Sequence, residues 1–137
     1  MITALDTNIL LDILLSDPHF FSRSSAALEA AATAGSLVIC DLVYAEIAVH
    51  FDAQDGCDEF LSDVEIRVEP LSRPASFLAS RAWRTYRERG GRRARILADF
   101  LIGAHAQAQA SRLLSRDRGF YRSAFPSLEI IDPTSTD

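Results

Sequence analysis

Residues 2–10 read Ile-Thr-Ala-Leu-Asp-Thr-Asn-Ile-Leu, and this stretch decides the fold. It opens with a short apolar run, which predicts a buried strand over residues 2–6. The strand stops at Asp6, and Thr7 or Asn8 can then cap a short helix. A strand that passes through one acid into a helix is typical of a sheet whose strands alternate with helices.

The same alternation continues to the end of the chain. Asp17 (followed by a proline), Asp41 and Ser72 are predicted to cap the helices that follow them. Strands are predicted at residues 37–40, 66–69, 113–115 and 128–131. Helices are predicted at 17–34, 41–49, 52–63 and 72–89, around Asp99 as far as about residue 110, and near 117–121. This order favours a parallel sheet that is covered by helices on both faces.

Asp99 is the acid whose position is hardest to explain as an ordinary surface charge. It lies in the apolar run Ile-Leu-Ala-Asp-Phe-Leu-Ile-Gly-Ala, residues 96–104. Its helical neighbours Ile102, Gly103 and Ala106 place it on an inward face. Burying an ionised carboxylate is costly without compensation, and no nearby helical position carries a base. The partner of Asp99 must therefore be a side chain from elsewhere in the fold or a metal ion.

Three other acids share this apolar setting. Asp6 ends the first strand, Glu46 lies within the apolar residues 42–49, and Asp117 follows the run at 113–116. Any one of them alone could be a cap or a paired core acid. Ligands of parallel sheets bind beyond the carboxyl ends of the strands, where two of these acids stand. We therefore expect all three, together with the acid at position 99, to converge on one edge.

A cluster of carboxylates points to metal-dependent chemistry. Two such charges about 4 Å apart repel by about 4 kcal/mol at an effective dielectric constant near 20. A divalent cation reverses this repulsion, and oxygen ligands without histidine or cysteine favour Mg²⁺ or Mn²⁺ over zinc. One or two such ions can activate water and stabilise displacement at phosphorus. The acids therefore predict hydrolysis of phosphodiester bonds.

The composition places these acids in one intracellular domain. The chain has 137 residues, of which 48% are hydrophobic and 24% are charged, and its net charge is −5. No apolar run approaches the ~18 residues of a membrane span, and the start lacks the features of a signal peptide. Cys40 and Cys57 have no metal-ligand spacing. We expect a single domain over residues 1–132, a polar tail at 133–137, and a cytoplasmic location.

Four stretches together resemble a PIN-domain ribonuclease, and their order and the chain length look most like the VapC-type toxins of toxin–antitoxin pairs. The stretches are Leu5-Asp6-Thr7-Asn8-Ile9-Leu10, the helix of Glu46, the helix of Ala98-Asp99, and Leu113-Leu114-Ser115-Arg116-Asp117-Arg118-Gly119-Phe120. The resemblance covers essentially the whole chain. It implies a three-layer α/β/α sandwich with a mainly parallel five-stranded sheet, and Mg²⁺- or Mn²⁺-dependent cleavage of RNA. It also implies that the catalytic, metal-binding residues are Asp6, Glu46, Asp99 and Asp117.

The resemblance extends to supporting residues and to partners. Ser115 falls where the family often has a hydroxyl near the metal, and Thr7 could likewise hold a metal-bound water, whereas Asn8 orders the loop after the first strand. The family implies a homodimer and a cognate antitoxin whose tail covers the acidic pocket. Transfer RNA or ribosomal RNA is the expected class of substrate.

All fourteen basic residues are arginines, and seven of them fall within residues 81–95, interleaved with Trp83 and Tyr86. This stretch could grip an RNA backbone, dock an acidic partner segment, or form a solvated helix face. Arg116 flanks an acid and could pair with it or contact substrate. The residues predicted to bind RNA are Arg92, Arg93, Arg95 and Arg116.

Two other functions compete with this interpretation. A PIN domain can serve RNA maturation or decay without an antitoxin. A doubly wound phosphatase or phosphotransfer domain would use Asp6 as its nucleophile, but such families need a lysine near the phosphate and this chain has no lysine. The three histidines are expected in structural or surface roles. Asp12, Asp41 and Asp132 are expected as surface, cap and turn residues.

Overall fold

The computed structural model describes residues 1–91 and 97–135, and these residues fold around one five-stranded sheet. The strands are β1 (Ile2–Leu5), β2 (Ser36–Cys40), β3 (Ile66–Glu69), β4 (Arg112–Leu114) and β5 (Ile130–Ile131). Their order is β3-β2-β1-β4-β5, and every neighbouring pair is parallel. Since parallel crossovers are almost always right-handed, this order puts helices on both faces. The predicted α/β/α sandwich is confirmed.

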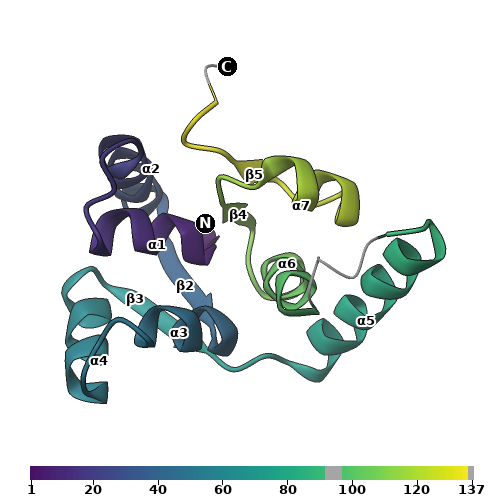
Figure 1. Ribbon diagram of the computed structural model, residues 1–137, viewed down its shortest axis with the longest axis horizontal. Coiled ribbons are helices and arrows are strands. Elements are labelled where there is room, and N and C mark those ends of the chain that lie inside the picture. Colours follow the sequence, from purple (N-terminus) through teal and green to yellow (C-terminus); the bar gives the residue numbers. More distant parts are fainter. Residues whose placement is uncertain (92–96, 136–137) are drawn as a thin grey trace.

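Seven helices connect the described strands. They are α1 (Thr7–Leu14), α2 (Phe21–Ala34), α3 (Asp41–Ala48), α4 (Gln54–Asp63), α5 (Arg73–Glu88), α6 (Leu97–Gln109) and α7 (Arg118–Ala124). Figure 1 shows α1 to α4 gathered beside β2 and β3, and α6 and α7 beside β4 and β5. None of the described helices combines the length and the hydropathy that crossing a bilayer requires.

The strand order creates a switch point between β1 and β4. The chain passes from β1 outward to β2 and β3, then returns to the other side of β1 to form β4. The ends of the two central strands align, because Leu5 is paired with Leu114 and the Asp6 amide donates to the Leu114 carbonyl at 3.0 Å. Ligands of open parallel sheets bind at such a point, so whatever follows these two strands is well placed to form a site.

The core is built from the central strands and the inward face of α6. Leu5, Ile39 and Leu113 are buried in the sheet, and Phe100 and Ile102 are buried on α6. Each such side chain contributes about 1.5–3 kcal/mol on burial. The loops that follow β1 and β4 are therefore anchored at their starts by the best-packed part of the molecule.

Three predicted helix caps are wrong. The cap of α1 is Asp6, whose Oδ1 accepts the Thr7 amide, and not Thr7 or Asn8, which lie inside the helix. Asp17 does not begin α2, because its Oδ1 accepts the His19 and Phe20 amides at 2.8 and 2.9 Å and so closes a turn that precedes the helix. Asp41 lies inside the first turn of α3 and makes no capping hydrogen bond. The prediction for Ser72 is confirmed, since its hydroxyl accepts the Ala75 amide at 3.1 Å and caps α5.

Candidate active site

Asp6 is the centre of the candidate site, at the carboxyl end of β1. Its side chain is only 6% exposed. Its Oδ1 accepts the Thr7 amide at 2.8 Å, which caps α1, and its Oδ2 accepts the Ser115 hydroxyl at 2.7 Å. The carboxylate is therefore fixed by the loops after both central strands.

The environment of Asp6 opposes its negative charge. Burial raises the pKa of Asp6 above its ordinary value, and the negative charge of Asp99 raises it further. Hydrogen bonds from Ser115, from the Thr7 amide and from Tyr121 offset part of this increase in pKa. A desolvated carboxylate beside a second acid is stabilised by a cation or by a proton.

Tyr121 is a site residue that the sequence analysis missed. It lies on α7 and is only 1% exposed. Burial raises its pKa far above the ordinary value, and the charges of Asp6, Asp99 and Asp117 raise it further. The phenol therefore stays protonated amid acids from three separate segments. The signal in the sequence was its spacing, because a residue four positions after Asp117 shares its helical face.

Glu46 and Asn8 connect this centre to neighbouring elements. Glu46 is exposed on α3, and its Oε1 accepts the Thr7 hydroxyl at 2.7 Å. The Asn8 amide nitrogen lies 3.4 Å from Asp6 Oδ2, and its Oδ1 accepts the Arg116 amide at 3.2 Å. Asn8 thus contacts the acid that ends β1 and the backbone of the loop after β4.

The loop after β4 carries the remaining predicted residues. The Ser115 hydroxyl, which donates to Asp6, also accepts the Asp117 amide at 2.9 Å. Asp117 is half-buried, and so is Asp99 in the first turn of α6. The structure thus brings Asp6, Ser115 and the Asp117 backbone into direct contact. Asp99 acts on Asp6 through its charge.

Arg116 is occupied by an ion pair rather than placed to meet RNA. Its Nε and Nη2 donate to the two carboxylate oxygens of Asp12 at 2.7 and 3.0 Å, and its guanidinium lies 4.0 Å from the Phe20 ring centroid. Asp12 is only 3% exposed and also accepts the Ser24 hydroxyl at 2.7 Å. The prediction of Asp12 as a surface residue is wrong. The prediction of Arg116 as an RNA contact is not supported, since the side chain fastens its loop to α1.

The other predicted RNA-binding residues, Arg92, Arg93 and Arg95, lie outside the described residues. On α5, Arg84 forms an ion pair with Glu88 at 3.0 Å, and both side chains are largely exposed. Such an exposed pair contributes little to stability. A role of the α5 arginines in binding RNA or an acidic partner stays a prediction.

Whether the acids suit a divalent ion depends on donor chemistry and on position. Within residues 1–91 and 97–135, no three His, Cys, Asp or Glu side chains are close enough together to hold a metal ion. Mg²⁺, however, commonly uses only one or two carboxylates and completes its shell with water and substrate phosphates. The mutually repelling pair of Asp6 and Asp99 has the right oxygen chemistry for that mode. The four-acid metal site stays a prediction.

A family model described as the PIN domain matches residues 3–126. The chain belongs to the PIN domain family. PIN domains are nucleases, which supports a hydrolytic activity for this chain. No curated protein sequence matches the chain.

Solved structures share this PIN fold at low sequence identity. VapBC2 from Rickettsia felis, bound to a DNA fragment from its promoter, is 23% identical with a TM-score of 0.75, covering 96% of this chain and 98% of that chain. VapBC-1 from nontypeable Haemophilus influenzae is 18% identical with a TM-score of 0.74, covering 98% and 100%. A toxin–antitoxin complex from Klebsiella pneumoniae is 21% identical with a TM-score of 0.64, covering 97% and 98%. At these identities the likeness establishes the fold.

Proposed function

We propose that this PIN domain is a Mg²⁺- or Mn²⁺-dependent endoribonuclease that acts in the cytoplasm as the toxin of a toxin–antitoxin pair. Membership of a nuclease family supports the hydrolytic activity. The shared fold with VapBC proteins and with a toxin–antitoxin complex supports the biological role. A cognate antitoxin and a second copy of the chain are the proposed protein partners.

The buried Asp6 at the switch point is the observation that carries this proposal. It is held in one orientation by Ser115 and by the Thr7 amide, and it is destabilised by burial and by Asp99. Such a carboxylate is poor as a structural group, because its charge is not neutralised by the groups that orient it. It is well suited to hold a cation against a phosphodiester.

Each residue of the site then has a role that follows from its contacts. Asp6 and Asp99 would hold the ion, with Asp117 and Glu46 as the further acids of the set. The ion, when bound, would polarise the phosphodiester and activate water. Thr7 keeps Glu46 directed at the site through its hydroxyl. Tyr121 keeps its proton and so remains a hydrogen-bond donor among the acids.

The test is cleavage of RNA by purified variants at saturating Mg²⁺. Asp6→Asn and Asp99→Asn should abolish cleavage while circular dichroism shows an intact fold. Asp63→Asn, which changes an exposed acid at the end of α4, is the matched control and should cleave normally. Undiminished cleavage by both site variants would refute the proposal. Sequencing RNA 5′ ends after a pulse of expression, with wild type against Asp99→Asn, would locate the cut sites.

The toxin role has its own test. Expression of the wild-type chain should arrest growth, and co-expression of a neighbouring gene that encodes the antitoxin should restore it. Asp99→Asn should not arrest growth at the same protein level. RNA cleavage without growth arrest would support the nuclease activity and refute the toxin role.

A further inference from the structure

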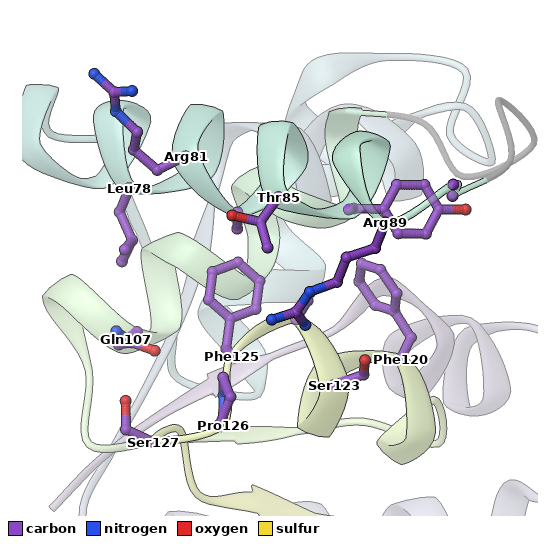
Figure 2. Close-up of a pocket in the computed structure, with 15 residues that line it drawn as sticks. Leu78, Arg81, Thr85, Arg89, Gln107, Phe120, Ser123, Phe125, Pro126 and Ser127 are labelled. Carbon is purple, nitrogen blue, oxygen red and sulfur yellow. The ribbon is translucent and has the colours of Figure 1, made fainter.

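A cavity of about 660 Å³ lies between α5, α6, α7 and the loop that follows α7. Figure 2 shows its lining, with side chains from α5 above and from α7 below. Three aromatic rings line it, those of Tyr86, Phe120 and Phe125, and none of the four predicted acids does. Its volume lies within the range typical of small-ligand sites. The cavity is therefore distinct from the acids at the switch point.

The charge of the lining is positive. Arg81 and Arg89 line the cavity and no acidic residue does, although the chain as a whole carries a net charge of −5. In Figure 2 the Arg89 guanidinium reaches over the cavity toward Phe120 and Phe125, whereas Arg81 points away. Within the described residues, neither arginine forms an ion pair. The lining suits a ligand that combines a negative group with a flat apolar surface.

Gln107 adds an unsatisfied hydrogen-bonding group to the same lining. Its Oε1 is buried and has no hydrogen-bond partner in the described part of the chain. A buried acceptor is costly to leave unpaired, so a ligand N–H group that reaches this oxygen from the cavity would be stabilising. Nucleobases offer an N–H edge and a flat ring, and their nucleotides offer a phosphate for arginine.

Phe120 places this cavity next to the candidate active site. Its ring centroid lies 5.0 Å from that of Tyr121 and 5.0 Å from that of Phe100. Tyr121 is the phenol that interacts with Asp6, and Phe100 directly follows Asp99. Phe120 thus joins the lining of the cavity to two buried rings that lie beside the acids in the fold or in the sequence.

We propose that this cavity, the base subsite, holds one nucleobase of the RNA substrate beside the bond that is cut. The inference rests on the proposed ribonuclease function and deepens it by naming what determines base preference. The aromatic lining takes the base, Gln107 accepts a hydrogen bond from its edge, and Arg89 pairs with its phosphate. An acidic, aromatic peptide of a protein partner is the other occupant of matching chemistry, and the experiment separates the two.

Mononucleotide binding tests the base subsite without any catalysis. AMP, GMP, CMP and UMP are titrated into the full chain in EDTA, with amide NMR shifts as the readout. At least one should shift amides that line the cavity, such as that of Ser123. Ser123→Phe, which fills the cavity from an exposed position, and Arg89→Gln should each weaken binding about tenfold, the loss expected for one stacked base. Arg23→Gln, the same charge change on the exposed face of α2, should bind as wild type does.

The outcomes separate the base subsite from the ribonuclease proposal. Absence of any mononucleotide binding overturns the base subsite, whether or not the chain cleaves RNA. Binding by a chain that cleaves no RNA supports the subsite and refutes the ribonuclease. Binding of a Glu-Phe repeat peptide in place of nucleotides overturns the proposal and assigns the cavity to a protein partner.

A second experiment measures base preference in the cleavage of RNA with randomised sequence. Wild type should prefer one base at a fixed distance from the cut. Ser123→Phe should flatten that preference, and an unchanged profile contradicts the subsite.

Discussion

The Asp6 carboxylate is held by hydrogen bonds in a buried position that disfavours its negative charge. The hydrogen bonds that fix the carboxylate do not cancel the cost of its burial, so its pKa is raised. In the absence of a cation, the ionised form therefore destabilises the folded state relative to the unfolded chain. The penalty begins as pH rises above the ordinary value near 3.8 and is complete above the raised pKa of the folded state.

Asp6→Asn should accordingly melt at a higher temperature than wild type in EDTA at neutral pH. The amide cannot ionise, so it avoids the penalty while keeping a side chain of the same shape. The difference in Tm should shrink as pH falls toward 4, where the wild-type carboxyl group takes up a proton. Added Mg²⁺ should stabilise wild type, because an ion that binds only the folded state shifts the equilibrium, and should leave the variant unchanged. A variant that melts below wild type at pH 7 would show that Asp6 is mainly a structural group.

Substitution of Arg116 distinguishes a structural role of this arginine from a role in binding RNA. Arg116→Met should lower the free energy of unfolding by about 3 kcal/mol or more, because it leaves the buried Asp12 carboxylate without its charged partner. Urea unfolding measures this loss. Arg122→Met, an exposed arginine on α7, is the control and should change stability little. A variant of Arg116 with unchanged stability but weaker RNA binding would restore the original prediction of an RNA contact.

The residues missed by the sequence analysis share one property, which is that their partners are remote in sequence. Asp12 was assigned to the surface, and nothing near it in the sequence indicates a partner for its charge. Its partner Arg116 is 104 positions away. Tyr121 was not singled out because a tyrosine after an acid is unremarkable until the fold places other acids around it. The local pattern singled out Asp6 because it ends an apolar strand, whereas Ser115 was indicated only by the resemblance to PIN-domain ribonucleases.

At the scale of the elements, the apolar runs predicted the strands well, and the polar caps predicted the helices less well. The strand at 66–69 has the bounds that were predicted, and β2 begins only one residue earlier than predicted. Asp17 and Asp41 failed as caps because the same side chain can close a turn or occupy a first helical turn. Burial decides where a strand lies, whereas a cap depends on backbone geometry that composition does not specify.

Glycine positions in α6 and α7 give a matched pair of element-scale substitutions. A Cβ at Gly103 would lie 2.3 Å from a ring atom of Phe125, whereas one at Gly119 would have no neighbour within 4 Å. Gly103→Ala should destabilise the fold, since overpacking costs about 1–3 kcal/mol and exceeds the gain in helix propensity. Gly119→Ala should gain up to about 1 kcal/mol.

Thermal unfolding compares the two glycine variants directly. Their Tm values should move in opposite directions from wild type. Gly103→Ala should also weaken binding in the base subsite, because the displaced Phe125 ring lines that cavity. Equal, stabilising shifts in both variants would show that α6 and the Phe125 loop separate without cost.

At the scale of the whole molecule, the strand order brings distant residues together. The sheet places β4 beside β1, so Asp6 meets Ser115 across 109 positions of sequence. The alternation of strands and helices predicted the parallel sheet. It did not fix how the side chains at the switch point pair, because that depends on the register between β1 and β4. The sequence could therefore indicate which edge carries the site, but not which hydrogen bonds orient it.

His105, which joins α6 to the edge strand β3, should contribute to the loss of the free energy of unfolding at acidic pH. The imidazole is buried, and its Nε2 lies 3.1 Å from Glu69 Oε1. Burial lowers its pKa from the ordinary value near 6.5, and the Glu69 interaction offsets only part of that decrease. Below about pH 6.5 the unfolded chain takes up a proton that the folded chain does not. Stability is therefore lost as pH falls from 6.5 through the lowered pKa of the folded state.

His105→Gln should remove that loss. Urea unfolding between pH 7.5 and 5 should show a shallower decrease in the free energy of unfolding for the variant than for wild type, whatever its stability at neutral pH. Toward pH 5 the free energy of unfolding of the variant should rise relative to that of wild type, because only wild type carries the histidine penalty. In the Asp6→Asn background the contrast should be clearer, since the opposing gain from protonating Asp6 is absent. Parallel curves for His105→Gln and wild type would mean that the pKa of His105 is the same in the folded and the unfolded chain. Burial would then not oppose protonation of the imidazole.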